Sequence, residues 1–153
     1  MKKYLVIYYT RSGNTKKVAS TLTKIIENNI EELIEKKKYK GFIGFISAGF
    51  ASFKKKTVEI GQLKYNPKDY EEVVFMTPIW ASNIPPTIRT YIKRYAEVIK
   101  SSSFIYLSNS GEEYKPEKEL SEEYKLKVRD SLNIKKDRLS NKDYIMKLEK
   151  FFK

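Results

Sequence analysis

The sequence predicts an α/β fold with a doubly wound, five-stranded parallel sheet in the strand order 2-1-3-4-5. Short, near-continuous apolar runs, typical of strands covered on both faces, alternate along the chain with segments of helical periodicity. Three of these runs lead into polar or glycine-containing loops. Strands that alternate with helices through short loops imply right-handed crossovers, and five such strands commonly take this order.

The N-terminal part of the chain predicts a strand, a helix and a second strand. Residues 4–9, YLVIYY, are almost continuously apolar and are expected at the centre of the sheet. From Thr15 onward apolar residues recur at helical spacing, which predicts a helix of about three to four turns that includes Ile25 and Ile26. Residues 30–34, IEELI, predict the second strand, although glutamate is a poor strand former.

Three more strands and two more helices complete the expected sheet. Residues 73–76, VVFM, and 104–108, FIYLS, predict buried strands. Residues 86–99 predict a helix whose proline lies in the first turn, where proline is tolerated. Residues 126–134 place apolar side chains at alternate positions, which is typical of an edge strand with one solvated face. A last helix is expected to begin near Asn141, a favourable N-cap residue.

Length and composition predict that residues 1–153 form a single domain. A chain of 153 residues, of which 41% are hydrophobic, can bury one core and leaves little room for a second. An insertion is expected at about residues 40–60, between the second and third strands. Its apolar and lysine-rich part, residues 40–56, either packs on the protein as a helix, which we favour, or lies on a membrane surface.

The composition excludes several kinds of catalytic site. The chain has no cysteine and no histidine, so it lacks thiolate ligands, cysteine nucleophiles and the commonest general base. We therefore expect no metal site and assign no catalytic residue. The apolar runs are shorter than a transmembrane helix, and the N-terminus shows no small-residue cleavage site, so we expect a cytoplasmic protein without a transmembrane segment.

The chain is strongly basic, with 31 Lys plus Arg against 19 Asp plus Glu and a formal net charge of +12. Such a charge is compatible with binding to nucleic acid or to another anionic surface. The lysines, however, are scattered over runs such as residues 35–40, 54–56 and 134–137. Lysine-rich runs are usually solvated faces, and we do not favour nucleic-acid binding.

The loop at residues 10–15, TRSGNT, predicts a phosphate-binding site. It follows the first strand and opens a helix, whose N-terminus offers unpaired N–H groups and about half a unit of positive charge. Its side chains add three hydroxyl groups and one amide, from Thr10, Ser12, Thr15 and Asn14. Gly13 permits a tight turn. The loop lacks the lysine of a P-loop and the spaced glycines of a dinucleotide fingerprint, which favours a single phosphate. A simple helix cap is the alternative, but it needs only one hydroxyl.

This loop resembles the phosphate-binding loop of flavodoxins and flavodoxin-like flavoproteins, whose pattern is Thr/Ser-x-Thr/Ser-Gly-x-Thr. Residues 77–92, TPIWASNIPPTIRTYI, are similar to the second flavin loop of that family, and residues 108–113, SNSGEE, lie where the third is expected. The resemblance covers essentially the whole chain. It implies a flavodoxin-like three-layer sandwich that binds FMN.

The resemblance also implies which residues contact FMN. They are Thr10, Arg11, Ser12, Gly13, Asn14 and Thr15 in the first loop, Thr77, Pro78, Ile79, Trp80, Ala81, Ser82 and Asn83 in the second, and Asn109, Ser110, Gly111 and Tyr114 in the third. The FMN monophosphate matches a single-phosphate loop, and the flat ring requires an apolar, aromatic slot. Trp80, the only tryptophan, is expected beside the ring rather than in the core. The family often has a glycine where this chain has Ala81 to Asn83.

An acidic segment follows the expected third loop. Residues 112–123 contain six Glu and two Lys, a local balance of 2 − 6 = −4. Acidic residues close to a flavin would oppose negative charge on the reduced ring and lower its second reduction potential. An ordinary solvated helix is an equally good interpretation of this segment.

The resemblance implies an FMN-dependent electron-transfer protein that shuttles electrons between redox partners, a role that requires no acid, base or nucleophile from the chain. Many flavodoxins are acidic, so the charge of +12 predicts partners with acidic docking surfaces or another anionic surface. The alternative is an NAD(P)H-dependent flavin or quinone reductase. A third hypothesis is a non-redox module that binds nucleic acid.

Overall fold

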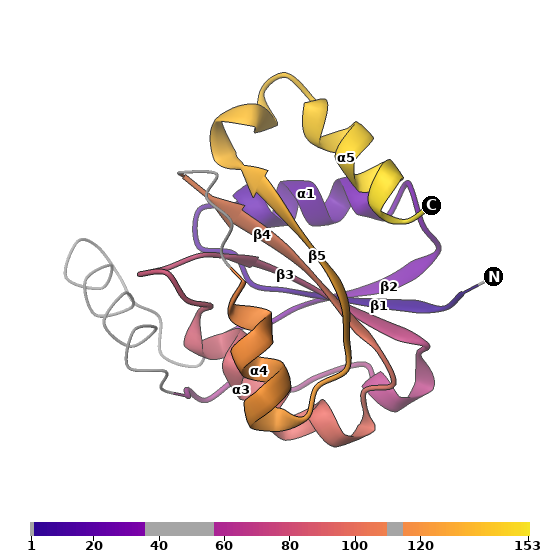
Figure 1. The fold of residues 1–153 in the computed structure, drawn as a ribbon, viewed down its shortest axis with the longest axis vertical. Coiled ribbons are helices and arrows are strands. Elements are labelled where there is room, and N and C mark those ends of the chain that lie inside the picture. Colours follow the sequence, from indigo (N-terminus) through magenta and orange to yellow (C-terminus); the bar gives the residue numbers. More distant parts are fainter. Residues whose placement is uncertain (1, 36–56, 110–114) are drawn as a thin grey trace.

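Five parallel strands form one sheet in the order β2-β1-β3-β4-β5, which confirms the predicted fold class. The computed structural model describes residues 2–35, 57–109 and 115–153 (Figure 1). The strands are β1 (Tyr4–Tyr8), β2 (Asn28–Glu32), β3 (Glu72–Pro78), β4 (Ser102–Ser108) and β5 (Val128–Lys135). All of the neighbouring strands pair in parallel.

Helices cover both faces of the sheet and make a three-layer sandwich. Figure 1 shows α1 and α5 on one face and α3 and α4 on the other. The helices are α1 (Asn14–Leu22), α3 (Pro86–Tyr95), α4 (Pro116–Tyr124) and α5 (Asp143–Phe151), with short 3-10 helices at η1 (Pro67–Asp69), η2 (Ala96–Val98) and η3 (Lys136–Leu139). None of the helices in the described ranges has both the length and the apolar character that a membrane span requires.

The central strands are apolar throughout because they are covered on both sides. In β1, Leu5 and Ile7 belong to the core beneath α3 and α4, whereas Val6 belongs to the core beneath α1 and α5. The side chains of all three are fully buried. Every residue of β3 and of β4 is buried as well. The near-continuous apolar runs therefore predicted these strands correctly.

The second strand differs from its prediction by two residues. It was expected at 30–34 but spans Asn28–Glu32 and is only half-buried along its length. It lies at the edge of the sheet, where glutamate side chains find polar partners: the Tyr8 hydroxyl donates to Glu32 over 2.7 Å, and Glu31 accepts from the backbone N–H of Lys64 over 2.5 Å. These contacts allow a strand in spite of poor intrinsic propensity.

Two helix boundaries also differ from their predictions. The first helix is shorter than expected, since α1 ends at Leu22 and the following turn packs Ile25 and Ile26 against the core. The helix expected over 86–99 is α-helical only to Tyr95 and ends in the 3-10 turn η2. The last helix begins at Asp143, close to its expected start near Asn141, and the Asp143 N–H donates to Asn141 Oδ1 over 3.3 Å.

The predicted insertion at 40–60 lies mostly outside the described residues, and so does the proposed amphipathic segment at 40–56. Glu35 and Ile60, which flank the segment at 40–56, pair as an isolated antiparallel bridge. This bridge brings the chain back beside the end of β2 before it enters β3.

Candidate functional site

The loops that follow β1 and β3 meet at the carboxyl edge of the sheet, where the strand order reverses. The two strands are parallel neighbours, with Tyr8 opposite Met76. Their contact continues beyond β1, because the backbone N–H of Tyr9 donates to the carbonyl of Met76 over 3.2 Å. Open α/β sheets bind ligands at such a point. The structure therefore brings together two of the three loops that the sequence marked.

The first loop turns into α1 through Gly13, which adopts a left-handed conformation with φ 89°. The Gly13 N–H donates to Thr10 Oγ1 over 3.0 Å, and the Asn14 amide donates to Ser12 Oγ over 3.4 Å. No side chain in the described ranges caps the start of α1. The first N–H groups of the helix therefore lack a side-chain cap among the described residues, as an anion site requires.

The space in front of this loop is open. A Cβ atom at residue 13 would meet no atom within 4 Å. Ser12 and Gly13 are exposed, Thr10, Arg11 and Asn14 are half-buried, and Thr15 is buried. Thr10 uses its oxygen to accept from Gly13, so its hydroxyl proton can still be donated to a ligand. These features fit a single phosphate group.

The second loop contains a two-residue turn between Trp80 and Asn83. The turn is closed by reciprocal backbone hydrogen bonds, 2.8 Å from Trp80 N to Asn83 O and 2.9 Å from Asn83 N to Trp80 O. Both central residues have positive φ, 46° at Ala81 and 60° at Ser82, as in a type I′ turn. Such turns usually contain Asn-Gly, and each non-glycine residue in this conformation costs about 1–2 kcal/mol. The turn is therefore strained.

This turn exposes its two central residues rather than its aromatic side chain. Ala81 and Ser82 are exposed, whereas the Trp80 side chain is 9% exposed and belongs to the core beneath α3 and α4. The indole contacts the Tyr9 ring edge-on, with 5.4 Å between centroids and an interplanar angle of 83°. Trp80 therefore lies in the core, contrary to the expectation from the sequence, and its predicted contact with a flavin stays a prediction.

The rest of the second loop is mostly buried. Thr77 and Pro78 end β3, and the Thr77 hydroxyl donates to the carbonyl of Pro78 over 3.0 Å. Ile79 is half-buried and packs against the same core as Trp80. Asn83 is half-buried, and its side-chain oxygen accepts from the N–H of Ile84 over 2.8 Å.

The third loop begins at Asn109, which is exposed directly after β4. Ser110, Gly111 and Tyr114 lie outside the described residues. The acidic segment continues into α4, where Glu117 is buried and accepts from the hydroxyls of Tyr106 over 2.7 Å and Ser131 over 2.8 Å. The described part of this segment is therefore not a uniformly solvated helix.

Comparisons with known proteins agree with this architecture. No family model matches the sequence, and no curated protein matches it significantly. Among solved structures, a flavoprotein from Lactobacillus acidophilus in complex with FMN has a TM-score of 0.75 at 19% identity, covering 92% of this chain and 98% of its own. Oxidised flavodoxin 1 from Bacillus cereus has a TM-score of 0.55 at 17% identity, covering 97% and 93%. The chain has a flavodoxin-like fold.

The flavodoxin-like fold is shared by proteins of different function. An NADPH-quinone reductase from P. pentosaceus has a TM-score of 0.59 at 7% identity, with 99% of this chain and 95% of that chain covered. At these identities the likeness establishes the fold alone. The resemblance inferred from TRSGNT is confirmed at that level, and the role of the site rests on its own residues.

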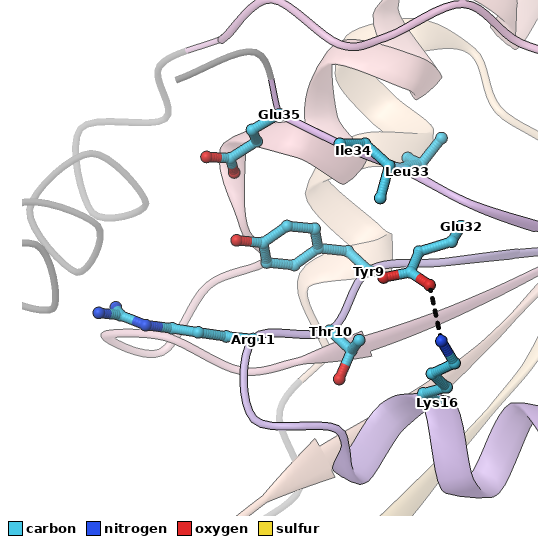
Figure 2. A pocket seen from close by; sticks show the side chains of 8 residues that line it. All are labelled: Tyr9, Thr10, Arg11, Lys16, Glu32, Leu33, Ile34 and Glu35. Atoms are coloured by element: carbon cyan, nitrogen blue, oxygen red, sulfur yellow. Dashed lines mark ion pairs between the residues drawn. The ribbon is translucent and has the colours of Figure 1, made fainter. Parts of the chain in front are cut away.

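A cavity of about 360 Å³ lies beside the first loop, on the side of β2. Figure 2 shows the side chains that line it, which are Tyr9, Thr10, Arg11, Lys16, Glu32, Leu33, Ile34 and Glu35. Lys16 lies 3.5 Å from the Glu32 carboxylate. The cavity thus combines two cationic and two acidic side chains close to the loop at residues 10–15.

Glu35 is the most deeply buried of these charged groups, with 6% of its surface exposed. The Thr87 hydroxyl, on the first turn of α3, donates a hydrogen bond to it. Burial raises the pKa of the Glu35 carboxyl above its ordinary value, although hydrogen bonds from Thr87 and Tyr9 and the charge of Arg11 oppose the rise. Sequence analysis missed this residue, because its position directly after an edge strand predicts solvent exposure.

Arg89 is a second residue of the site that sequence analysis missed. It lies on the first turn of α3 and is 1% exposed. Its guanidinium donates to Asn83 Oδ1 and to Glu123 Oε2, both over 3.1 Å. An arginine on the apolar face of a helix, together with glutamates on a later helix, is the signal that would have revealed it.

Proposed function

We propose that this protein binds FMN and transfers electrons between redox partners. The observation that carries the proposal is the loop at residues 10–15. It offers uncapped helix N–H groups, several hydroxyls and open space at Gly13, and it lies where the strand order reverses. A site of this kind suits one dianionic phosphate on a small cofactor.

The residues of both described loops have distinct roles in this proposal. The N–H groups at the start of α1 and the hydroxyls of Thr10 and Ser12 hold the phosphate. The backbone of the exposed residues Ala81 and Ser82 contacts the edge of the flavin ring. FMN supplies the redox chemistry when it is bound, and the protein binds it, orients it and sets its potential.

The experiment is an FMN titration followed by visible absorption and gel filtration. We expect a flavin band that stays with the protein. Riboflavin, which lacks the phosphate, is expected to bind at least about tenfold more weakly, because it loses hydrogen bonds to a charged group. A Gly13→Ala, Thr15→Val variant should lose affinity, whereas Ser20→Ala, at an exposed position on α1, should not.

Failure to bind micromolar FMN would contradict the proposal and also any flavin-dependent enzyme activity. Equal affinity for FMN and riboflavin would contradict only the phosphate-binding role of the loop at residues 10–15, and not flavin binding itself. If the protein binds no FMN, its basic surface would be the best remaining guide to function.

We also propose that the redox partners carry acidic docking surfaces, because the net charge is +12. Opposite charges accelerate encounter, and salt screens them over about 8 Å at physiological ionic strength. Electron-transfer rates to an acidic partner should therefore fall as salt rises. Rates that are independent of salt would contradict this choice of partner.

An NAD(P)H-dependent reductase is the second candidate. The cavity beside the first loop favours it, because a second ligand would need room and cationic groups close to the flavin, and Arg11 and Lys16 line this space. Rapid bleaching of bound flavin by NADH or NADPH would identify a reductase. Reduction only by one-electron donors would favour the carrier.

A further inference from the structure

Arg89 connects the turn after β3 to a helix on the far side of the third loop. One nitrogen of its guanidinium donates to Asn83 Oδ1, and the other donates to Glu123 Oε2 on α4. Glu119, one helical turn earlier on α4, lies 3.7 Å from the guanidinium. The arginine side chain is almost fully buried, whereas the two glutamates are 41% and 46% exposed. The Arg89 side chain is therefore inside the protein, whereas the carboxylates that pair with it, those of Glu119 and Glu123, are at the surface.

The turn that Arg89 contacts cannot rely on its own sequence for its shape. Ala81 and Ser82 both have positive φ, a conformation that other residues than glycine avoid. Such conformations persist only where the surroundings impose them. Asn83 Oδ1 accepts two hydrogen bonds, from the N–H of Ile84 and from Arg89, and these fix the residue that closes the turn.

We propose that Arg89 is a positioning residue that imposes the strained shape of the turn from Trp80 to Asn83 and ties that shape to α4. Because a charged donor holds Asn83, the bond is stronger than a neutral one. The exposed residues Ala81 and Ser82 are then presented in one orientation. That this orientation serves FMN rests on the proposed function, whereas the effect of Arg89 on the turn does not.

The first test uses Trp80, the only tryptophan, as a probe of the turn without any ligand. Arg89→Met keeps a side chain of similar length and leaves Glu119 and Glu123 exposed enough to stay solvated, so the variant should fold. We expect red-shifted Trp80 emission and stronger quenching by acrylamide. Arg94→Met, at an exposed position on the same helix, is the matched control and should change neither.

The second test is rescue by glycine. Arg89→Met should weaken FMN binding by about tenfold. The variant loses the charged hydrogen bond from Arg89 to Asn83, and with it the fixed orientation of the turn. Adding Ala81→Gly and Ser82→Gly to that variant should recover most of the affinity, because glycine adopts positive φ without strain. A role of Arg89 in general packing of α3 on α4 predicts no such recovery.

Unchanged Trp80 emission in Arg89→Met, or lost FMN affinity that the glycines fail to restore, would overturn the proposal. If Arg89→Met does not fold, Arg89→Lys takes its place, since lysine keeps the charge but cannot span both Asn83 and Glu123. The same emission shift and the same glycine rescue are then expected. If the wild-type protein binds no FMN, the proposed function fails, and the Trp80 emission of the variants still decides the role of Arg89.

Discussion

The hydroxyl of Thr87 donates a hydrogen bond to the carboxyl group of Glu35, although the two residues are 52 positions apart in the sequence. The bond joins the chain beyond β2 to the first turn of α3, and Glu35 lines the cavity in Figure 2. Glu35 has little access to solvent there, and burial raises its pKa. The carboxyl group therefore makes stability depend on pH at the edge of the candidate site.

We predict that Glu35→Gln stabilises the protein at neutral pH. A pKa raised in the folded state means that Glu35 favours folding below its ordinary value of 4.5, and that this contribution is lost as pH rises through the higher folded value. Glutamine keeps an acceptor for Thr87 without the charge. We expect a gain of about 1 kcal/mol at pH 7, measured by urea unfolding, and a smaller gain toward pH 4. Glu27→Gln, at an exposed position, is the control.

An equal gain from Glu35→Gln at both pH values would show that charge is not the cause. A loss of stability at pH 7 would show that the ionised carboxylate is favourable in its site. Either result would contradict the pKa direction on which the prediction depends.

Glu72 is buried at the amino end of the central strand β3 but is surrounded by donors. Lys2 Nζ lies 2.5 Å and Arg129 Nε 3.1 Å from its carboxylate, and the Ser103 hydroxyl donates to it. Burial alone would raise the pKa of Glu72, but the hydrogen bonds from Lys2 and Ser103 and the charge of Arg129 outweigh burial and lower it. This carboxylate therefore contributes stability above pH 4.5 that is lost as pH falls through its lower folded pKa.

We predict that Glu72→Gln destabilises the protein at neutral pH by about 2 kcal/mol, because the Lys2 and Arg129 charges lose their partner and the lost interaction is partly screened. For a chain of this size, the melting temperature should fall by about 4–8 °C. Glu71→Gln, at the adjacent exposed position, should have little effect. The difference between the two variants should narrow as pH falls below 4.5, and a constant difference would contradict the electrostatic cause.

The sequence predicts the strands of the core more reliably than the polar contacts of the site. Leu5, Val6 and Ile7 identify β1 because a strand buried on both faces requires apolar side chains throughout. The loop at residues 10–15 was found for a similar reason, since its hydroxyls and its glycine are adjacent in the chain. Glu35 and Arg89 acquire their roles only when distant segments meet. Pairings over such separations leave no local pattern in one sequence.

Boundaries failed where tertiary contacts override local preference. Residues 28–32 form β2 because an edge position supplies partners for Glu31 and Glu32, which intrinsic propensity does not include. The positive φ of Ala81 and Ser82 was likewise unpredictable, because neither residue favours it. The strained turn of the site is therefore a property of its surroundings.

Gly13 allows the cost of a positive φ to be measured apart from any steric clash of an added side chain. We predict that Gly13→Ala costs about 1 kcal/mol of stability because φ is 89°, although the added Cβ would have no atom within 4 Å. Gly61→Ala is the matched control, because its Cβ would make only ordinary contacts with Ile34, the nearest at 3.6 Å. Urea unfolding of both variants measures the difference. Equal stability of the two would contradict the conformational explanation.

Trp80 makes FMN binding visible in fluorescence if the ring lies against the turn after β3. The indole contacts Tyr9 with 5.4 Å between ring centroids, so Trp80 is fixed beside the first loop as well as within the second. We predict that saturating FMN quenches its emission by more than about half, whereas inorganic phosphate, which fills the first loop alone, leaves it nearly unchanged. Tyr9→Leu should alter the emission of the free protein, because it removes the edge-on contact, but it should preserve the quenching by FMN. If FMN binds without quenching Trp80, the ring lies elsewhere, and the backbone of Ala81 and Ser82 does not contact it.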